Sequence, residues 1–311
     1  MEPTPEIKTR LSQLEEKYKS MGQDMVSYLD GLLYSDYLTY WDYIHIDTLL
    51  TLQNTRTKYP DETVFIIYHQ ITELYFKLIL WEIQQITNQQ HKPDFLTTRM
   101  HRINRYWENL IRSFDIMVDG MDKEEFMKFR MALLPASGFQ SAQYRLIEIC
   151  ATDFINLVSP GARNNLKNSE SFEEMYEHIY WKTGSVELQT GKKTLTLRQF
   201  EEKYSTQFIK TAYEFKEKNL NNYFQQTASI YGKDENLQKE YKQFDLNVNV
   251  HWPLVHYRSA VRYLQNDPDV IAATGGTNWQ KYLPPRFQRR IFFPDLWSKE
   301  EMDEWGRGAT S

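Results

Sequence analysis

Residues 61–84 form the longest uninterrupted helical pattern in the chain. The stretch DETVFIIYHQITELYFKLILWEIQ contains no residue that breaks a helix, and it is much longer than a typical globular helix of about 11–12 residues. Apolar side chains occur on nearly all of its sides, which predicts a helix buried in the protein. Asp61 and Glu62, after Pro60, supply the negative charge that a helix start favours. His69 lies at the edge of the narrow polar stripe, so the pattern predicts a histidine inside the protein.

Composition excludes several classes of protein. The 311 residues carry a net charge of −5, which argues against nucleic acid as a partner, because phosphate binding requires clustered Lys and Arg. Cys150 is the single cysteine, so no internal disulfide is possible and a reducing compartment is favoured. The N-terminus lacks the pattern of a signal peptide, and the most apolar window holds several polar residues, which argues against a membrane span. We therefore expect a soluble, cytoplasmic protein.

Strand patterns are scarce along the chain. A turn signal between short alternating segments predicts one small β-hairpin at residues 186–197, and the polar residues 159–171 predict a loop. The predicted fold is all-α, a helical-bundle core with residues 159–240 as an inserted elaboration. Helical periodicity recurs in residues 38–53, 95–115, 123–133, 139–158, 200–231, 235–241 and 248–263.

Two of the seven histidines, His69 and His256, lie in apolar, aromatic helical segments. A lone buried histidine is most often a core residue with a satisfied hydrogen bond. Two of them in a core poor in cysteine also suit haem, whose iron is often held by one proximal histidine. Residue patterns alone leave both interpretations open. The motifs of zinc sites, nucleotide-binding loops and serine hydrolases are absent from the sequence.

Three further residues are candidates for contact with a small polar ligand. Arg130 ends a predicted helix among aromatic residues, where a guanidinium suits bidentate capture of a carboxylate. An arginine that contacts a helix-end carbonyl or a surface acid is an equally good interpretation. Ser137 and Thr274 lie in loops beside glycines, where hydroxyl and peptide groups could bind a ligand or simply stabilise a turn.

Four segments in this order resemble the haem-dependent tryptophan 2,3-dioxygenase family along nearly the whole chain. They are TYWDYIHIDTLLTLQ at 39–53, ETVFIIYHQITELYFKLIL at 62–80, FRMALLPASGFQSAQYR at 129–145, and the region 252–277, with W-x-x-x-H followed by ATGGT. The resemblance implies a single haem-binding domain over residues 1–311 and one haem b per subunit. It also implies a homotetramer that cleaves the indole C2–C3 bond of L-tryptophan with O₂. The product, N-formyl-L-kynurenine, is the first intermediate of tryptophan catabolism by the kynurenine route.

The resemblance also implies a role for individual residues. His256 matches the proximal ligand of the haem iron, with Trp252 as its partner, and Ser137 lies near the haem edge. His69 matches the distal histidine that meets the indole N–H, and Arg130 and Thr274 match the groups that hold the amino-acid end. The remaining matches are to the substrate pocket, with the N-terminal segment 1–53 reaching into a neighbouring subunit: Phe65, Ile66, Ile67, Tyr68, Phe126, Tyr40, Tyr43 and Ile44.

The sequence departs from the family pattern at two places. Phe126 stands where the family often has tyrosine, and Ala273 precedes Thr274 where the family usually has glycine. Two alternatives therefore stay open beside the dioxygenase. One is a related haem-dependent monooxygenase acting on an aromatic amino acid, and the other is a non-catalytic helical protein that binds haem or tryptophan.

Overall fold

The chain folds into helices that belong to two compact units, residues 1–54 and 55–311. Apart from the helices, the described residues contain two isolated antiparallel bridges, Val158 with Ile179 and Val186 with Lys193. The predicted all-α fold is confirmed. The computed structural model describes residues 2–35, 38–88, 92–130, 139–182, 185–186, 191–264 and 284–307.

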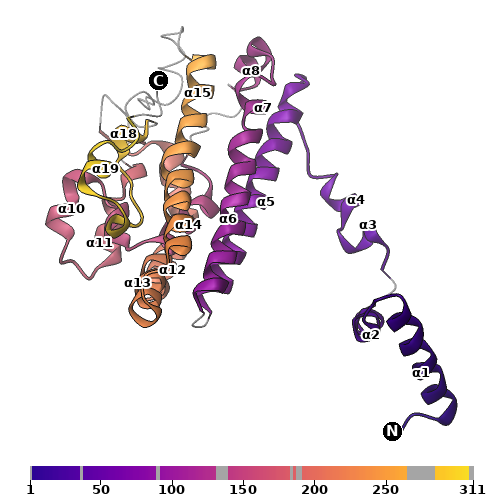
Figure 1. The fold of residues 1–311 in the computed structure, drawn as a ribbon. Coiled ribbons are helices and arrows are strands. Elements are labelled where there is room, and N and C mark those ends of the chain that lie inside the picture. The colour runs from indigo at the N-terminus through magenta and orange to yellow at the C-terminus, as the bar shows by residue number, and fades with distance from the viewer. Residues whose placement is uncertain are drawn as a thin grey trace. The chain divides into compact units, whose positions relative to one another are not determined.

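The N-terminal unit is made of short helices that bury none of their own residues within the unit. The prediction of one helix over residues 38–53 was wrong, because His45 has a left-handed backbone, with φ of 52°, and divides the segment. Thr39 caps the first half as its sequence position suggests, its hydroxyl accepting from the Asp42 N–H. The helices are α1 (Pro5–Ser20), α2 (Met25–Leu33), α3 (Tyr40–Tyr43) and α4 (Ile46–Leu49) (Figure 1).

The larger unit is built around the predicted long helix, which extends over Asp61–Thr87. Its α-helices are α5 (Asp61–Thr87), α6 (Pro93–Ser113), α7 (Asp115–Val118), α8 (Lys123–Arg130), α9 (Ala142–Ala151), α10 (Pro160–Leu166), α11 (Phe172–Glu177), α12 (Leu195–Phe215), α13 (Leu220–Tyr231), α14 (Glu235–Leu246), α15 (Trp252–Leu264), α18 (Pro285–Gln288) and α19 (Lys299–Asp303). Shorter helical turns are η2 (Phe154–Leu157), η3 (Tyr180–Lys182), η4 (Asn247–His251) and η5 (Pro294–Leu296).

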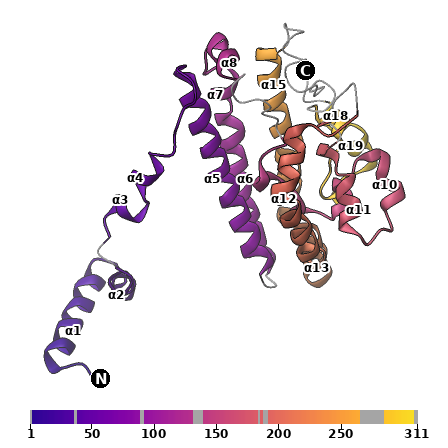
Figure 2. The ribbon, with the colours of Figure 1, turned by 180° about the vertical axis from the view of Figure 1, so that it is seen from behind.

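The core lies where long helices pack side by side. Helix α6 lies beside α5 (Figures 1 and 2) and also packs against α14. Helix α9 packs against α5 and α12. Phe76 of α5, Trp107 of α6 and Phe244 of α14 are fully buried between these helices. Such aromatic side chains each remove a large apolar area from water, which stabilises the packed arrangement. The resulting bundle fixes α5 and α15, the two helices that carry the candidate histidines.

One face of α5 contradicts the prediction that this helix is buried all round. Ile79, Ile83 and Ile86 are completely buried on the face toward α6 and α9. A second row, spaced by three or four residues along the same helix, lies on the surface of the chain. We call this row the α5 stripe; its side chains are between 41% and 57% exposed, and they are Ile67, Ile71, Leu74, Leu78 and Trp81.

Two local predictions also differ from the structure. Residues 159–171 are not a simple loop, because α10 starts at Pro160, whose fixed backbone angle suits a first helical position. The predicted hairpin at 186–197 is shorter than expected: Val186 and Lys193 form an antiparallel bridge, but residues 195–197 are the first turn of α12, and residues 187–190 lie outside the described residues. Among the helices that the structure describes, none combines the length and apolar character needed to cross a membrane.

Candidate functional site

His69 lies on α5 with its ring held by the helix itself. Its Nδ1 lies 2.7 Å from the carbonyl oxygen of Phe65, and because a carbonyl only accepts, Nδ1 carries the proton. The Phe65 and His69 rings stack obliquely, with centroids 4.0 Å apart. The side chain is accessible to solvent, yet the surrounding protein desolvates it and lowers its pKa below 6.5. At neutral pH the ring is therefore uncharged, and its Nε2 is a free acceptor.

His256 on α15 has the same local geometry. Its Nδ1 donates to the carbonyl oxygen of Trp252, one turn earlier, at 2.9 Å. The ring packs between Phe114 and Trp252, with centroid distances of 4.3 and 4.4 Å. Burial lowers the pKa of His256 to about 4. The Nε2 lone pair is therefore available at neutral pH, and the hydrogen bond at Nδ1 fixes the ring orientation, as is usual for histidines that bind metals.

The two histidines are linked by a chain of aromatic contacts. A positive charge on His69 would also lower the pKa of His256 further. Aromatic rings also connect them: Tyr68 lies 6.3 Å from His69 and 5.8 Å from Phe114, which packs on His256. The buried Tyr68 is fixed by a hydrogen bond from its hydroxyl to the Leu110 carbonyl. The site therefore presents two neutral imidazoles from two different helices.

Arg130, half-buried at the end of α8, has one guanidinium nitrogen shielded from water. Its Nη1 is buried and has no hydrogen-bond partner among the described residues. Burial also lowers its pKa. A buried N–H donor without an acceptor is costly, and a carboxylate is the group that best complements a guanidinium. One turn earlier, Phe126 contacts Phe65 at a centroid distance of 6.4 Å, so the aromatic part of α8 adjoins the ring that packs on His69.

The predicted residues have different positions relative to these contacts. Ile66 is half-buried, whereas Ile67 is exposed and belongs to the α5 stripe. Ser137 and Thr274 lie outside the described residues. The residues that ring contacts connect into one site are Phe65, Tyr68, His69, Phe126, Trp252 and His256.

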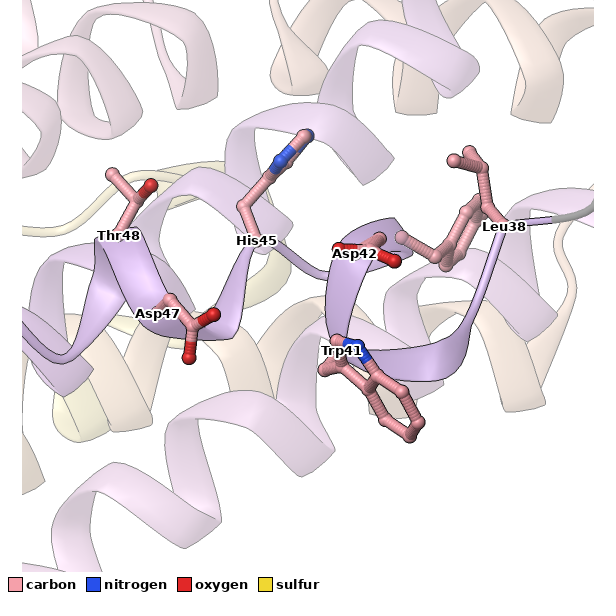
Figure 3. A pocket seen from close by; sticks show the side chains of 7 residues that line it. Leu38, Trp41, Asp42, His45, Asp47 and Thr48 are labelled. Atoms are coloured by element: carbon pink, nitrogen blue, oxygen red, sulfur yellow. The ribbon is translucent and has the colours of Figure 1, made fainter.

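Three predicted pocket residues belong to the N-terminal unit. Tyr40 and Tyr43 are 75% and 73% exposed, and Ile44 is 37% exposed. The same segment contains a surface hollow, and Figure 3 shows the side chains that line it. The hollow is lined by Leu38, Trp41, Asp42, Tyr43, His45, Asp47 and Thr48.

Three aromatic residues that contact these side chains were not predicted from the sequence. Phe114 contacts His256, Phe129 contacts Phe65 at 5.8 Å, and Tyr263 contacts Phe126 at 4.3 Å. For Tyr263 a signal was present, since it lies seven residues after His256 and thus on the same face of α15. Phe114 had no such signal, because its contact joins segments more than 140 residues apart.

Comparison with known proteins gives a consistent result. The family model for tryptophan 2,3-dioxygenase matches residues 31–267. A tryptophan 2,3-dioxygenase of Bacillus thuringiensis subsp. konkukian is 26% identical over 284 residues, covering 85% of this chain and 92% of that enzyme. One of Ruegeria sp. is 40% identical over 117 residues, which cover 37% of this chain and 42% of that enzyme. One of Xenopus tropicalis is 36% identical over 150 residues, covering 43% and 35% respectively.

Proposed function

The chain belongs to the tryptophan 2,3-dioxygenase family and is an oxidoreductase of tryptophan catabolism, and we propose that His69, Arg130 and His256 carry its reaction. The proposed substrates are L-tryptophan and O₂, and the proposed product is N-formyl-L-kynurenine, formed by cleavage of the indole C2–C3 bond. This is the first step of the kynurenine pathway. The family is haem-dependent in general, and we propose one haem b per subunit and a cytoplasmic location.

The residues present fit a haem. His256 offers an unprotonated Nε2 with its ring orientation fixed by the Trp252 carbonyl, which are the properties of a histidine that can bind haem iron. The described residues contain no group of three or more His, Cys, Asp or Glu side chains that could hold a metal ion together. His256 would hold the haem through its Nε2. When bound, the haem supplies the oxygen chemistry, and the protein supplies orientation and exclusion of water.

The remaining side chains would bind and orient the amino acid. The Nε2 of His69 is an acceptor for the indole N–H, because its Nδ1 proton is already donated to Phe65. Phe65 offers a ring face on which the indole can pack. The unpaired Nη1 of Arg130 would bind the substrate carboxylate. Holding the amino acid at both ends fixes the indole relative to the cofactor, and positioning of this kind contributes up to ~7–11 kcal/mol in favourable systems.

The observation that carries the proposal is the combination of two neutral imidazoles with a half-buried arginine whose Nη1 is buried and has no hydrogen-bond partner among the described residues. A protein that binds haem but no substrate would need a neutral imidazole, but it would gain nothing from an arginine nitrogen without a partner. The family resemblance adds three predictions that the described residues do not test. Ser137 lies at the haem edge, Thr274 contacts the amino-acid end of tryptophan, and Tyr40, Tyr43 and Ile44 reach a neighbouring subunit's pocket.

The function is tested by the mass of the product. Purified, haem-loaded protein is mixed with L-tryptophan under anaerobic conditions, its absorption is recorded, and ¹⁸O₂ is then admitted. We expect the haem absorption band to shift on addition of tryptophan, and a product heavier by both oxygen atoms. A product with a single oxygen atom would instead indicate the monooxygenase, for which Phe126 in place of tyrosine is the motivating observation. Binding without consumption of O₂ would indicate a non-catalytic protein.

Arg130→Ala is expected to weaken tryptophan binding by about 10- to 100-fold while haem binding is retained. The reason is the loss of a charge-assisted hydrogen bond to the carboxylate, which contributes about 1.5–3 kcal/mol. The dissociation constant is measured by titrating the haem absorption band with L-tryptophan. Tryptamine, which lacks the carboxylate, should bind both proteins equally. Arg258→Ala, at an exposed position of α15, serves as the control. An unchanged affinity for L-tryptophan would remove Arg130 from this role.

We further propose that the chain assembles as a homotetramer, and the α5 stripe supports a self-association surface. Its five apolar side chains form one continuous row along a helix whose other face is buried in the core. Leu74→Glu together with Leu78→Glu should split the assembly, because each places a charge in an apolar interface. Sedimentation velocity of the double variant should show smaller species. Lys77→Glu, on the same helix but outside the stripe, should leave the tetramer intact. If the double variant is also a tetramer, the stripe is not the interface.

A further inference from the structure

The helix that carries His256 does not begin where the sequence analysis places it. Instead of a new helix at residue 248, the chain continues from α14 through η4, Asn247–His251, into α15 without interruption (Figure 1). The η4 segment is a turn of π-helix, the wider form that often occurs at functional sites. It ends directly before Trp252, the residue whose carbonyl oxygen accepts the hydrogen bond from His256.

Pro253 accounts for the π-helical turn. A proline inside a helix has no N–H to donate, and its ring clashes with the carbonyl one turn earlier, which favours a wider turn. The Trp252 N–H accordingly bonds to the Asn247 carbonyl, five residues back. The Val248 carbonyl therefore loses both of its possible helical donors. The Trp252 N–H, its donor in an α-helix, is used elsewhere, and Pro253, its donor in a π-helix, has none.

The Tyr144 hydroxyl replaces the missing donor. Val248 is completely buried, so water cannot satisfy its carbonyl, and the hydroxyl of Tyr144 on α9 donates to it at 3.1 Å. The same hydroxyl oxygen accepts from the buried guanidinium of Arg290, whose Nη1 and Nη2 both lie 3.2 Å away. The hydroxyl therefore accepts from Arg290 and donates to the Val248 carbonyl. Its donor direction is fixed, because the guanidinium offers protons only.

The Tyr144 ring is also packed against the aromatic cluster that surrounds Trp252. Phe76 and Trp107 lie 5.6 and 6.0 Å from the Tyr144 ring, and 5.9 and 5.7 Å from the Trp252 ring. A shift of α9 relative to the π-helical turn is therefore resisted both by packing and by the hydrogen bond. These contacts hold Val248 and Trp252, which lie eight and four residues before His256.

We propose that Tyr144 is a positioning residue for the proximal histidine, with its hydroxyl acting as the peptide N–H that Pro253 lacks. By holding the Val248 carbonyl it fixes the π-helical turn, which sets where the Trp252 carbonyl lies and hence the direction of the His256 Nε2. The role toward haem rests on the proposed function. The stabilisation of the π-helical turn by Tyr144 depends only on its hydrogen bond to Val248. It can therefore be measured without haem.

The first test is Tyr144→Phe, which removes the hydroxyl and keeps the ring. In the haem-free protein, we expect amide hydrogen exchange at Trp252, Leu254 and Val255 to become about tenfold faster, equivalent to about 1.4 kcal/mol, because the buried carbonyl is left without a donor. In the haem-loaded ferrous protein, we expect a shifted iron–histidine stretching band in the resonance Raman spectrum and about tenfold faster haem loss. Tyr241→Phe is the matched control, since the Tyr241 hydroxyl is buried on α14 and has no hydrogen-bond partner among the described residues.

The second test is rescue by Pro253→Ala, which restores a peptide N–H at the position where it is missing. If the Tyr144 hydroxyl replaces that donor, Tyr144→Phe should accelerate exchange strongly with Pro253 present and at most about twofold in the Pro253→Ala background. Equal acceleration in both backgrounds, or equal effects of Tyr144→Phe and Tyr241→Phe, would overturn the proposal. Faster exchange in a protein that takes up no haem would refute the proposed function and leave the hold of Tyr144 on the turn established.

Discussion

His256→Ala is expected to abolish stable haem binding, with an affinity loss well above 100-fold. Loss of a residue that merely orients a metal ligand typically costs 10- to 100-fold in affinity, and loss of the ligand itself costs more. His256 is uncharged at neutral pH and its Nδ1 is already bonded to the Trp252 carbonyl, so its Nε2 is the nitrogen available to iron. The measurement is the haem absorption of the purified variant after reconstitution with haemin. Added imidazole should restore part of the absorption band.

His251 provides the matched control for this prediction. It lies five residues earlier in the same continuous helix, is half-buried, and has a pKa that burial lowers as well. Its Nδ1, however, lies 3.2 Å from the side-chain oxygen of Asn247, within the buried polar contacts of the π-helical turn. We expect His251→Ala to retain haem and His69→Ala to retain haem but bind tryptophan more weakly. Full haem retention in His256→Ala together with loss in His251→Ala would transfer the ligand role to His251.

Where the geometry is local, it follows from the spacing of residues along a helix. The spacing of four residues between Trp252 and His256 places a helix carbonyl beside the imidazole, and Phe65 and His69 repeat the same arrangement. Helix existence also followed from periodicity, because a buried stripe requires apolar residues at helical spacing. His45 is an exception: its left-handed conformation breaks a pattern that is helical on both sides.

Contacts between distant segments were not predictable from one sequence. An apolar pattern says that a face avoids water, but it does not say whether the rest of the same chain covers it, so the α5 stripe was wrongly assigned to the core. The donor for the Val248 carbonyl comes from Tyr144, more than 100 residues earlier. Whether Nη1 of Arg130 finds a hydrogen-bond partner likewise depends on every segment packed around it. Pro253 gave the one local indication, since a proline within a helix always leaves carbonyls without donors.

The largest effect on stability is expected at Glu148, the single buried carboxylate between two buried arginines. Its side chain is 1% exposed, and those of Arg145 and Arg290 are 4% and 3% exposed. Glu148 Oε2 lies 2.9 Å from Arg145, and Oε1 pairs with Arg290 and accepts from the Tyr180 hydroxyl at 2.6 Å. Glu148→Gln keeps the shape but leaves two guanidiniums without a counter-charge in a low-dielectric interior. Breaking a buried ion pair in this way typically costs about 3–5 kcal/mol of unfolding free energy.

Urea unfolding of the haem-free protein gives this cost, with Glu82→Gln as the matched control. Glu82 is also 1% exposed, but its partners Arg99 and Arg102 are 24% and 48% exposed, so both can be solvated when the charge is removed. We therefore expect Glu82→Gln to cost about 1 kcal/mol, near the range of partly exposed pairs. Adding Arg145→Met to Glu148→Gln should recover part of the loss, since it removes one uncompensated buried charge. Equal losses of unfolding free energy for the two glutamate variants would contradict this prediction. They would mean that uncompensated buried charge does not set the cost at Glu148.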